Sequence, residues 1–300
     1  MNDAAHATGL TAPAAISPNP QDAYPPAQVA RLVEQVGVRK ANLPIRATVM
    51  LGILAGAFIA FGAMYYTVAI TDSSLGFGPA RLLGGIAFSL GLVLVIVGGA
   101  ELFTGNNLIV MAWAERKVTT LQLLLNWTVV YAANLVGALG CAFMVAWSGT
   151  LGLGDGAVGA TAMRIAEAKV ALGFGEAFFR GILCNTLVCL AVWLCFAAQG
   201  VASKILAIVL PISAFVALGF EHSVANMYLI PVAMLAGAEN VSLAGFIGNL
   251  IPVTLGNIVG GGVFVALVYW LIYLYGQGQE PVATEPARDA RRSGTRGSDS

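Results

Sequence analysis

Five long stretches of this chain contain no charged residue, and they constrain the fold more than any other feature. An uncharged run of about 18 or more apolar residues is long enough to cross a bilayer as a helix. Only 10% of the 300 residues are charged, against about 25% in a soluble domain. The sequence therefore predicts an all-α, polytopic membrane protein. The uncharged stretches are those between Arg46 and Asp72, Arg81 and Glu101, Lys117 and Asp155, Arg180 and Lys204, and Glu239 and Glu280.

Composition also argues against several other classes. The net charge of zero gives no reason to expect a nucleic-acid partner. The cysteines are interpreted as buried free thiols that act as small apolar residues. Because they lack a Cys-x-x-Cys spacing, the sequence predicts neither a metal site nor a cofactor. All four lie inside apolar runs: Cys141, Cys184, Cys189 and Cys195.

The chain divides into four parts. Residues 1–26 and 276–300 are rich in small and polar residues and are predicted to be disordered tails. The first 46 residues contain no apolar core of the length that a cleaved signal peptide needs. Residues 27–46 are predicted to form an amphipathic cytoplasmic helix on the membrane surface, and residues 47–275 a six-span pore domain. The helix would place four residues on its apolar face: Val29, Leu32, Val33 and Val36.

Two of the six predicted membrane elements, 82–113 and 205–236, are too long for simple spans. A continuous helix of about 32 residues would measure roughly 48 Å, against a hydrocarbon core of about 30 Å. Each carries a polar, glycine-containing insert at mid-length, GGAELFTGNN in the first and GFEHSVAN in the second. We therefore expect both helices to break at membrane depth, where irregular backbone must be buried or line a cavity. The other elements are predicted at 47–71, 121–147, 180–199 and 246–275, with an amphipathic stretch at 160–179.

The two halves of the chain repeat each other. Three matches occur in the same order, at offsets of 120, 123 and 129 residues. Because each half holds three spans, the second copy must be inverted relative to the first, and such repeats place a solute site where their broken helices meet. The matched motifs are Gly99-Ala-Glu101 with Asn106 and Gly219-Phe-Glu221 with Asn226; Asn126 with Asn134 and Asn249 with Asn257; and Gly52-Ile-Leu with Gly181-Ile-Leu.

Lysine and arginine counts predict the orientation. With both termini on one side, that side holds eleven of these residues and the other side holds four. Because cytoplasmic segments carry the excess of Lys and Arg, both termini are predicted to be cytoplasmic. The four on the outer side are Arg81, Arg164, Lys169 and Arg180.

The ionisable residues deepest in the membrane are Glu101, Glu221 and His222. A charge at that depth costs about 3 kcal/mol on insertion scales, so its presence needs a reason. The glutamates are interpreted as acceptors for backbone N–H groups freed by the breaks, with direct solute contact as the alternative. His222 has no counterpart in the first half, where Leu102 stands, which favours a pore-lining role. Thr104 adds a hydroxyl to the other break.

The motifs FGPARLLGG, GGAELFTGNN, GILCNTLVCLAVW, ALGFEHSVANM and IPVTLGNIVGGG resemble those of the formate/nitrite transporter family over about residues 27–275. This resemblance implies an aquaporin-like six-span protomer in the bacterial inner membrane. It further implies a homopentamer with one pore per protomer around a lipid-plugged axis.

The resemblance also implies three groups of site residues. The first meets the substrate, with Thr104 on a mobile loop and Lys169 in a vestibule: His222, Thr104, Asn185 and Lys169. The second forms apolar constrictions: Phe88, Leu92, Leu102, Val188 and Phe215. The third stabilises the breaks: Glu101, Glu221 and Asn226. Formate channels often carry aspartate at the position of Glu101, so GxELFTG is closer to nitrite-type members, whereas IPVTLGNIVGGG is closer to the formate type.

These observations predict a channel for small monovalent anions, most directly formate, in which His222 shares a proton with the solute. Nitrite, hydrosulfide and lactate stay open as substrates, as does tight proton coupling. A neutral-solute channel of the aquaporin type predicts paired Asn-Pro-Ala motifs, and none occurs. An intramembrane enzyme using His222 and Glu221 needs a nucleophile or metal set that the sequence does not offer. The chain is therefore not expected to be an enzyme.

Overall fold

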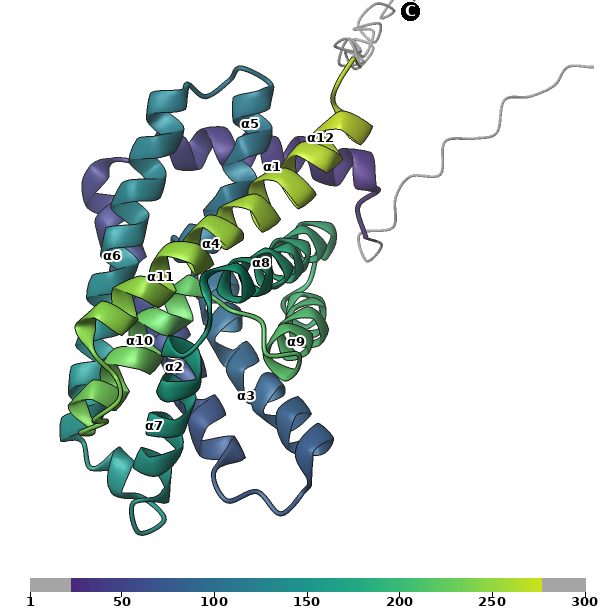
Figure 1. Cartoon of the computed structure of the whole chain (residues 1–300). Coiled ribbons are helices and arrows are strands. Elements are labelled where there is room, and N and C mark those ends of the chain that lie inside the picture. The colour runs from purple at the N-terminus through teal and green to yellow at the C-terminus, as the bar shows by residue number, and fades with distance from the viewer. Residues whose placement is uncertain (1–22, 277–300) are drawn as a thin grey trace, which may run out of the picture.

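The computed structural model describes residues 23–276, and these fold into helices with no strand among them (Figure 1). The predicted tails, 1–26 and 276–300, lie outside the described residues except for 23–26 and 276. The first half contains α1 (Pro26–Ala41), α2 (Ile45–Ile70), α3 (Phe77–Gly98), α4 (Phe103–Asn106), η1 (Asn107–Ile109), α5 (Val110–Ala114) and α6 (Thr120–Trp147). The second half contains η2 (Thr150–Gly152), α7 (Ala157–Val170), α8 (Phe174–Ala197), α9 (Val201–Ala217), α10 (Ser223–Leu235), α11 (Leu243–Ile258), the π-helical η3 (Val259–Leu267) and α12 (Val268–Tyr273).

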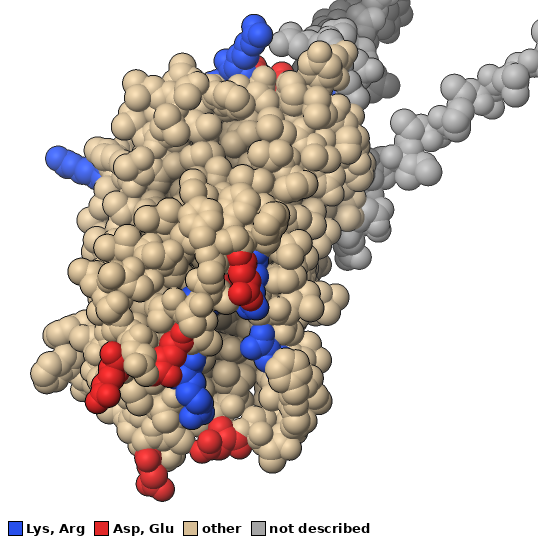
Figure 2. Space-filling model, viewed as in Figure 1, with Lys and Arg blue, Asp and Glu red and all other residues tan. Residues whose placement is uncertain are grey.

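Several of these helices are long and apolar enough to cross a membrane. Five described segments meet that criterion, and the shorter α9 and α10 are also apolar. Large apolar side chains cover the outside, and on the face seen in Figure 2 most charged side chains gather toward the two ends and around a hollow near its middle. The prediction of an all-helical, multi-pass membrane protein is confirmed. The five segments are Ile45–Ile70, Phe77–Gly98, Thr120–Trp147, Phe174–Ala197 and Leu243–Tyr273.

The two long predicted elements are both broken, as expected. α3 ends at Gly98 and the helical path resumes at Phe103, while α9 ends at Ala217 and α10 starts at Ser223. The chain turns at Gly99 with a φ of 80° and at Gly219 with a φ of 74°. Glycine adopts this left-handed conformation without a Cβ penalty, which explains its place in both inserts. The helices begin earlier than predicted, α3 at Phe77 and α9 at Val201.

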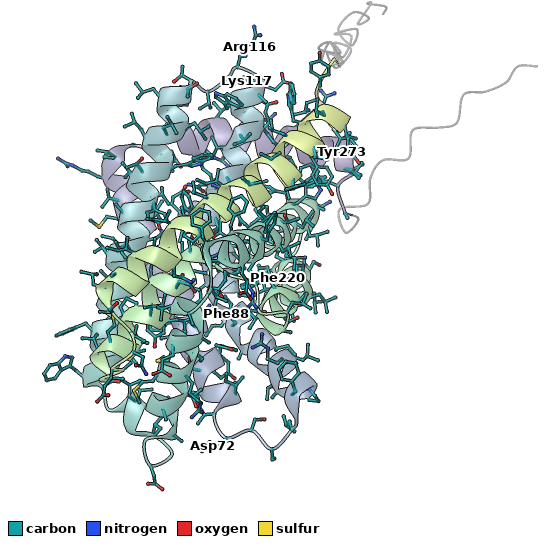
Figure 3. All side chains as sticks on the ribbon, viewed as in Figure 1. Asp72, Phe88, Arg116, Lys117, Phe220 and Tyr273 are labelled. Carbon is teal, nitrogen blue, oxygen red and sulfur yellow. The ribbon has the colours of Figure 1, made fainter. Side chains whose placement is uncertain are left out.

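Helix α1 differs from the surface helix that the sequence predicts over 27–46. It ends at Ala41, and α2 begins at Ile45. Val29 and Val33 are buried in one cluster with Ile109 and Met111, so the apolar face packs against η1 and α5. Figure 1 shows α1 and α5 at one end of the molecule and α7 at the other. Figure 3 shows Lys117 at the α5 end and Asp72 at the opposite end.

Glycines let α2 pack against α6, and α8 against α11, at backbone contact. Such close approach is how small residues hold membrane helices together. It also brings the polar side chains of α6 and α11 against the helix breaks. A Cβ added at any of four glycines would lie 2.0–2.2 Å from a backbone oxygen of the facing helix: Gly56, Gly137, Gly256 and Gly260.

Replacing Gly137 with alanine should therefore destabilise the protein. The new Cβ would lie 2.0 Å from the Ile53 carbonyl oxygen, and overpacking of this kind costs about 1–3 kcal/mol. Gly140→Ala is the matched control, because it lies on the same helix with nothing within 4 Å of the added Cβ. Thermal denaturation of the detergent-purified variants should lower the midpoint for Gly137→Ala alone. Equal midpoints would contradict this account of the packing.

Candidate solute site between the helix breaks

Each helix break delivers one polar side chain to the centre of the molecule. Thr104 lies in the first turn of α4, and His222 caps the N-terminus of α10. Thr104 Oγ1 and His222 Nε2 are 3.0 Å apart, and both residues are fully buried. The backbone N–H of Ala225 donates to His222 Nδ1 at 3.0 Å. In a neutral imidazole the proton then sits on Nε2, which donates to Thr104 and leaves the threonine hydroxyl proton for another acceptor.

Aromatic rings close this polar pair on one side. The rings of Phe88 and Phe215 meet edge to face with centroids 5.4 Å apart. The Phe215 ring also stacks on the His222 imidazole at 5.9 Å. All three residues line a cavity of about 350 Å³ that extends toward α7. We call this the outer cavity.

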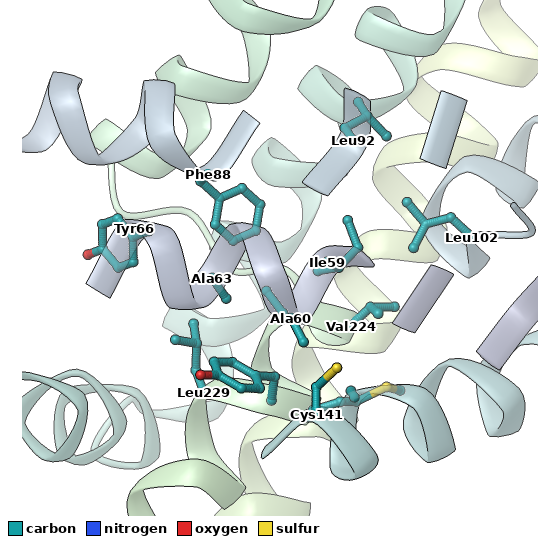
Figure 4. Packing of buried hydrophobic residues seen from close by; sticks show 14 of the residues in the cluster. Ile59, Ala60, Ala63, Tyr66, Phe88, Leu92, Leu102, Cys141, Val224 and Leu229 are labelled. Carbon is teal, nitrogen blue, oxygen red and sulfur yellow. The ribbon is translucent and has the colours of Figure 1, made fainter. Parts of the chain in front are cut away.

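Aliphatic side chains line a second, smaller cavity. Leu92 and Leu102 are 2% exposed and line a separate cavity of about 70 Å³ beneath α1. Val188, on α8, is buried in the same cluster. Figure 4 shows Phe88, Leu92 and Leu102 around Ile59 of α2. All five predicted constriction residues are buried in one apolar cluster. Phe88 and Phe215 line the outer cavity, and Leu92 and Leu102 line the cavity beneath α1.

Asn185 contacts the loop that carries Thr104. Its Nδ2 donates to the Thr104 carbonyl oxygen at 3.2 Å and to Asn107 Oδ1 at 2.8 Å. It also donates to the Asn257 carbonyl oxygen at 2.7 Å. A Cβ at Gly261 would lie 2.5 Å from this nitrogen, so glycine is needed there to admit the amide. The amide N–H groups of Asn185 are therefore used within the protein, and they hold the backbone of Thr104 in place.

Asn134 of α6 satisfies the backbone of the first break. Its Oδ1 accepts the Phe103 N–H at 2.9 Å. Its Nδ2 donates to the carbonyl oxygens of Gly52 at 2.8 Å and Glu101 at 2.9 Å. One side chain therefore pairs three backbone groups that water cannot reach.

Asn257 of α11 does the same for the second break. Its Oδ1 accepts the Ser223 N–H at 2.9 Å. Its Nδ2 donates to the carbonyl oxygens of Gly181 at 2.8 Å and Glu221 at 3.0 Å. The two backbone N–H groups are thus accepted by asparagines of the neighbouring helices and not by the glutamates.

The glutamates instead anchor two similar ionic networks. Lys40 Nζ lies 2.8 Å from Glu101 Oε1 and 3.0 Å from Asn106 Oδ1. Asn106 Nδ2 donates to Glu101 Oε2 at 2.8 Å and to Asn126 Oδ1 at 2.9 Å. The Asn126 amide returns to the Lys40 carbonyl at 3.2 Å. This closed ring ties the end of α1 to the first break.

The second network joins the end of α7 to the other break. Lys169 Nζ lies 2.8 Å from Glu221 Oε1. Asn226 Nδ2 donates to Glu221 Oε2 and Asn249 Oδ1, both at 2.7 Å, and the Asn249 amide returns to the Lys169 carbonyl at 2.9 Å. Lys169 lines the outer cavity, where its side chain is 14% exposed. The predicted vestibule lysine is thus paired with a carboxylate.

Sequence reasoning missed Lys40, although a signal for it exists. Lys40 and Lys169 are 129 residues apart, the offset that relates Gly52 to Gly181. Both lie within an amphipathic stretch that precedes a membrane helix. Aligning the stretch at 27–46 with the one at 160–179 would have identified the pair.

The fold and the site define a multi-pass helical membrane protein in which two broken helices hold a polar pair between separate cavities. The sequence profile of the family described as "Formate/nitrite transporter" matches residues 27–271. The chain belongs to this family.

Among curated relatives, it is 43% identical over 275 residues to the "Formate channel FocA" of Escherichia coli (strain K12), covering 85% of this chain and 96% of that protein. It is 40% identical over 266 residues to the "Probable formate transporter" of Methanothermobacter thermautotrophicus, covering 83% and 97%. A solved structure titled "Pentameric formate channel with formate bound" aligns with a TM-score of 0.72 and 42% identity, over 77% of this chain and 98% of its own. Another, titled "FNT family ion channel", aligns with a TM-score of 0.74 and 30% identity, over 82% and 98%.

The buried ion pairs give a stability prediction. Lys169→Met leaves the carboxylate of Glu221 without its cation in a site where the Glu221 side chain is 4% exposed. Removing one partner of a buried pair costs about 3–5 kcal/mol, because the remaining charge stays desolvated. Adding Glu221→Gln removes that charge and should recover much of the loss. Thermal midpoints of the single and double variants measure this, and a double variant no more stable than Lys169→Met would show that the unpaired charge is not the cause.

Proposed function

We propose that this protein is a channel for small monovalent weak-acid anions, with formate as its substrate. The observation that carries the proposal is the Thr104–His222 pair, a buried hydrogen-bonding site set among apolar residues at the end of the outer cavity. A site of this kind admits a solute small enough to pass between the rings and polar enough to need a partner there. The relatives named as formate channels support the substrate, and a family of transporters supports a role other than an enzyme's.

Anions are drawn to both mouths by an excess of cationic side chains. Lys169 is neutralised by Glu221 and Arg180 is paired with Glu176, so Arg81 and Arg164 supply the net charge of the outer cavity. Clefts with one sign of charge raise the local concentration of oppositely charged solutes. A third cavity, of about 390 Å³, lies at the first break and also has an excess of cationic side chains. Its lining contains one carboxylate, that of Glu101, and three cations: Arg39, Lys40 and Lys204.

Passage requires the anion to lose its water between Phe88 and Phe215. Desolvation disfavours the charged form of the solute, so the constriction favours the neutral, protonated acid over the anion. The hydroxyl of Thr104 then donates to an oxygen of the solute, while Nε2 of His222 donates to Thr104 and polarises that hydroxyl. The Ala225 N–H bond to Nδ1 supports a neutral His222, since a second ring proton would break it. Proton sharing by His222, as the sequence predicts, would require that contact to open.

The same proposal includes the inverted repeat. The two Lys–Glu–Asn–Asn networks use equivalent residues in the two halves and open to opposite cavities, which supports copies of opposite orientation. In this arrangement residues 47–275 form the six-span pore domain, and α9 with α10 provides the fifth span. Residues 27–46 contribute the cytoplasmic helix α1, and 1–26 and 276–300 are the tails.

We further propose a homopentamer in the bacterial inner membrane with both termini in the cytoplasm. The solved pentameric relative supports the assembly. The orientation follows from the excess of Lys and Arg near the termini, four of which, Arg288, Arg291, Arg292 and Arg296, lie outside the described residues. Native mass measurement should give a pentamer, and a C-terminal reporter that is active only in the cytoplasm should be active. A stable monomer or a silent reporter would contradict the respective proposal.

Flux through proteoliposomes tests the function. The wild-type protein should pass formate faster than acetate, lactate or glycerol. Thr104→Val keeps the shape but removes the hydroxyl, and should lower formate flux about tenfold, the effect of losing roughly 1.4 kcal/mol. Thr104→Ser is the matched control and should keep most of the flux. His222→Phe should lower flux by at least as much, because it removes the donor that polarises Thr104.

Nitrite and hydrosulfide in the same panel decide the substrate. If nitrite passes faster than formate, nitrite is the preferred substrate, and the proposal of an anion channel is kept. Faster glycerol flux would indicate a neutral-solute channel. Unchanged formate flux and an unchanged pH profile in both Thr104→Val and His222→Phe would remove these residues from the mechanism.

A further inference from the structure

Two arginines donate to backbone carbonyls at the second break, between α9 and α10, which we call the outer break. Arg81, on α3, donates from Nε to the Ala217 carbonyl oxygen at 2.9 Å and from Nη2 to that of Val216 at 3.1 Å. Arg180, on α8, donates from Nη1 to the Gly219 carbonyl oxygen at 3.0 Å. The last carbonyls of a helix lack intrahelical donors and form the negative end of its dipole. Two guanidinium groups supply both the donors and the charge.

Among the described residues, the first break, between α3 and α4, has no such contacts, and we call it the inner break. The backbone link is the same in both halves: the Glu101 N–H donates to the Leu51 carbonyl and the Glu221 N–H to the Arg180 carbonyl, each at 3.2 Å. Leu51 thus takes the place of Arg180, 129 residues earlier. Within residues 23–276, no lysine or arginine side chain is found donating to the carbonyls at the end of α3. The guanidinium contacts are therefore an addition to the outer break alone.

The local geometry is built around these contacts. Gly85, one turn after Arg81, packs so closely on α9 that a Cβ there would lie 2.5 Å from the Ser213 carbonyl oxygen. This proximity lets the Arg81 side chain reach the carbonyls of the last turn of α9. A Cβ at Gly219 would lie 2.9 Å from Arg81 Nη2 and 3.5 Å from Arg180 Nη1. Both guanidinium groups therefore converge on the residue at which the chain turns.

We propose that Arg81 and Arg180 are positioning residues that fix the outer break and thereby set the size limit of the Phe88–Phe215 constriction. Phe215 lies directly before the carbonyls that Arg81 holds, and His222 directly follows the segment that Arg180 holds. The Phe220 N–H donates to the Phe215 carbonyl at 3.0 Å, so the turn and the constriction move together. The inference rests on the proposed function, because it assigns the selectivity of that same path.

The matched control for this proposal is Arg164. It lines the same cavity as Arg81, but its guanidinium bonds to Thr161 Oγ1 on α7 and not to the break. Arg81→Gln and Arg164→Gln therefore remove the same charge from the same cavity, and only the first releases α9. Arg81→Lys keeps the charge but replaces the guanidinium fork with a single point donor.

The first readout is the ratio of acetate flux to formate flux in proteoliposomes. Arg81→Gln should raise this ratio about tenfold, equivalent to roughly 1.4 kcal/mol, because the ring gap widens. Arg81→Lys should raise it less, and Arg180→Gln should raise it in the same direction. Arg164→Gln should leave the ratio unchanged while lowering both fluxes at low ionic strength. An equal ratio in Arg81→Gln and Arg164→Gln would overturn the proposal.

The second readout is amide hydrogen exchange, which needs no transport. Exchange at Phe220 and Glu221 should accelerate in Arg81→Gln and not in Arg164→Gln, with Glu101 as the internal reference at the other break. If the wild-type protein moves no formate but the two variants differ in exchange, the proposed function is rejected and the positioning role of Arg81 is kept. If the wild-type protein moves formate but the two variants exchange equally, only the positioning role of Arg81 is rejected. If Arg81→Gln does not fold, Arg81→Lys and Arg180→Gln provide the same comparison.

Discussion

Backbone groups freed inside a bilayer must find partners within the protein, and this requirement determines most of the structure described here. Each broken helix exposes N–H and C=O groups where water is absent. Asn134 and Asn257 each pair two of these groups, and each also donates to a carbonyl of the neighbouring helix, Gly52 of α2 or Gly181 of α8. These amides reach the breaks because glycines bring α6 against α2 and α11 against α8. The close helix packing is therefore what allows the broken helices to have their backbone groups paired.

The polar site arises where the second half departs from the first. Leu102 and His222 occupy equivalent places in the sequence, so the second half carries a ring nitrogen where the first carries an aliphatic side chain. Gly56 of α2 corresponds to Asn185 of α8, whose amide holds the Thr104 loop. Tyr131 and Thr254, also equivalent by position, bond to each other at 2.8 Å between α6 and α11. The matched motifs of the two halves therefore mark both breaks, and the proposed chemistry rests on positions at which the two halves differ.

Sequence predicted the parts of this arrangement that depend on length and pattern. The 82–113 and 205–236 elements exceeded a bilayer's thickness and carried polar inserts, so their breaks could be inferred. His222 could be singled out because an ionisable group at that depth needs a reason, and Thr104 because it is a hydroxyl in the other break that the family resemblance also marks. The repeat had already marked Asn134 and Asn257, without indicating what they bond.

Partner choice could not be predicted, because it depends on how distant segments pack. Glu101 pairs with Lys40 across 61 residues, and α1 turns its apolar face toward η1 and α5. Hydrophobic periodicity shows that a helix has an apolar face and does not show what covers it. The arginines at the end of α9 were counted for orientation, yet their contacts with its carbonyls follow from the crossing of α3 and α9 near Gly85.

The central claim is that the solute passes between the two breaks at Thr104 and His222. The sequence contains two histidines, His6 and His222, so a His6→Gln variant labelled with ¹⁵N-histidine reports from His222 alone. Nitrogen NMR of this variant in lipid bilayers, titrated with formate, tests the claim most directly. The account predicts that formate shifts the His222 ring signals and that Thr104→Val weakens the shift. Ring signals that do not respond to formate, in protein that still conducts it, would contradict the account.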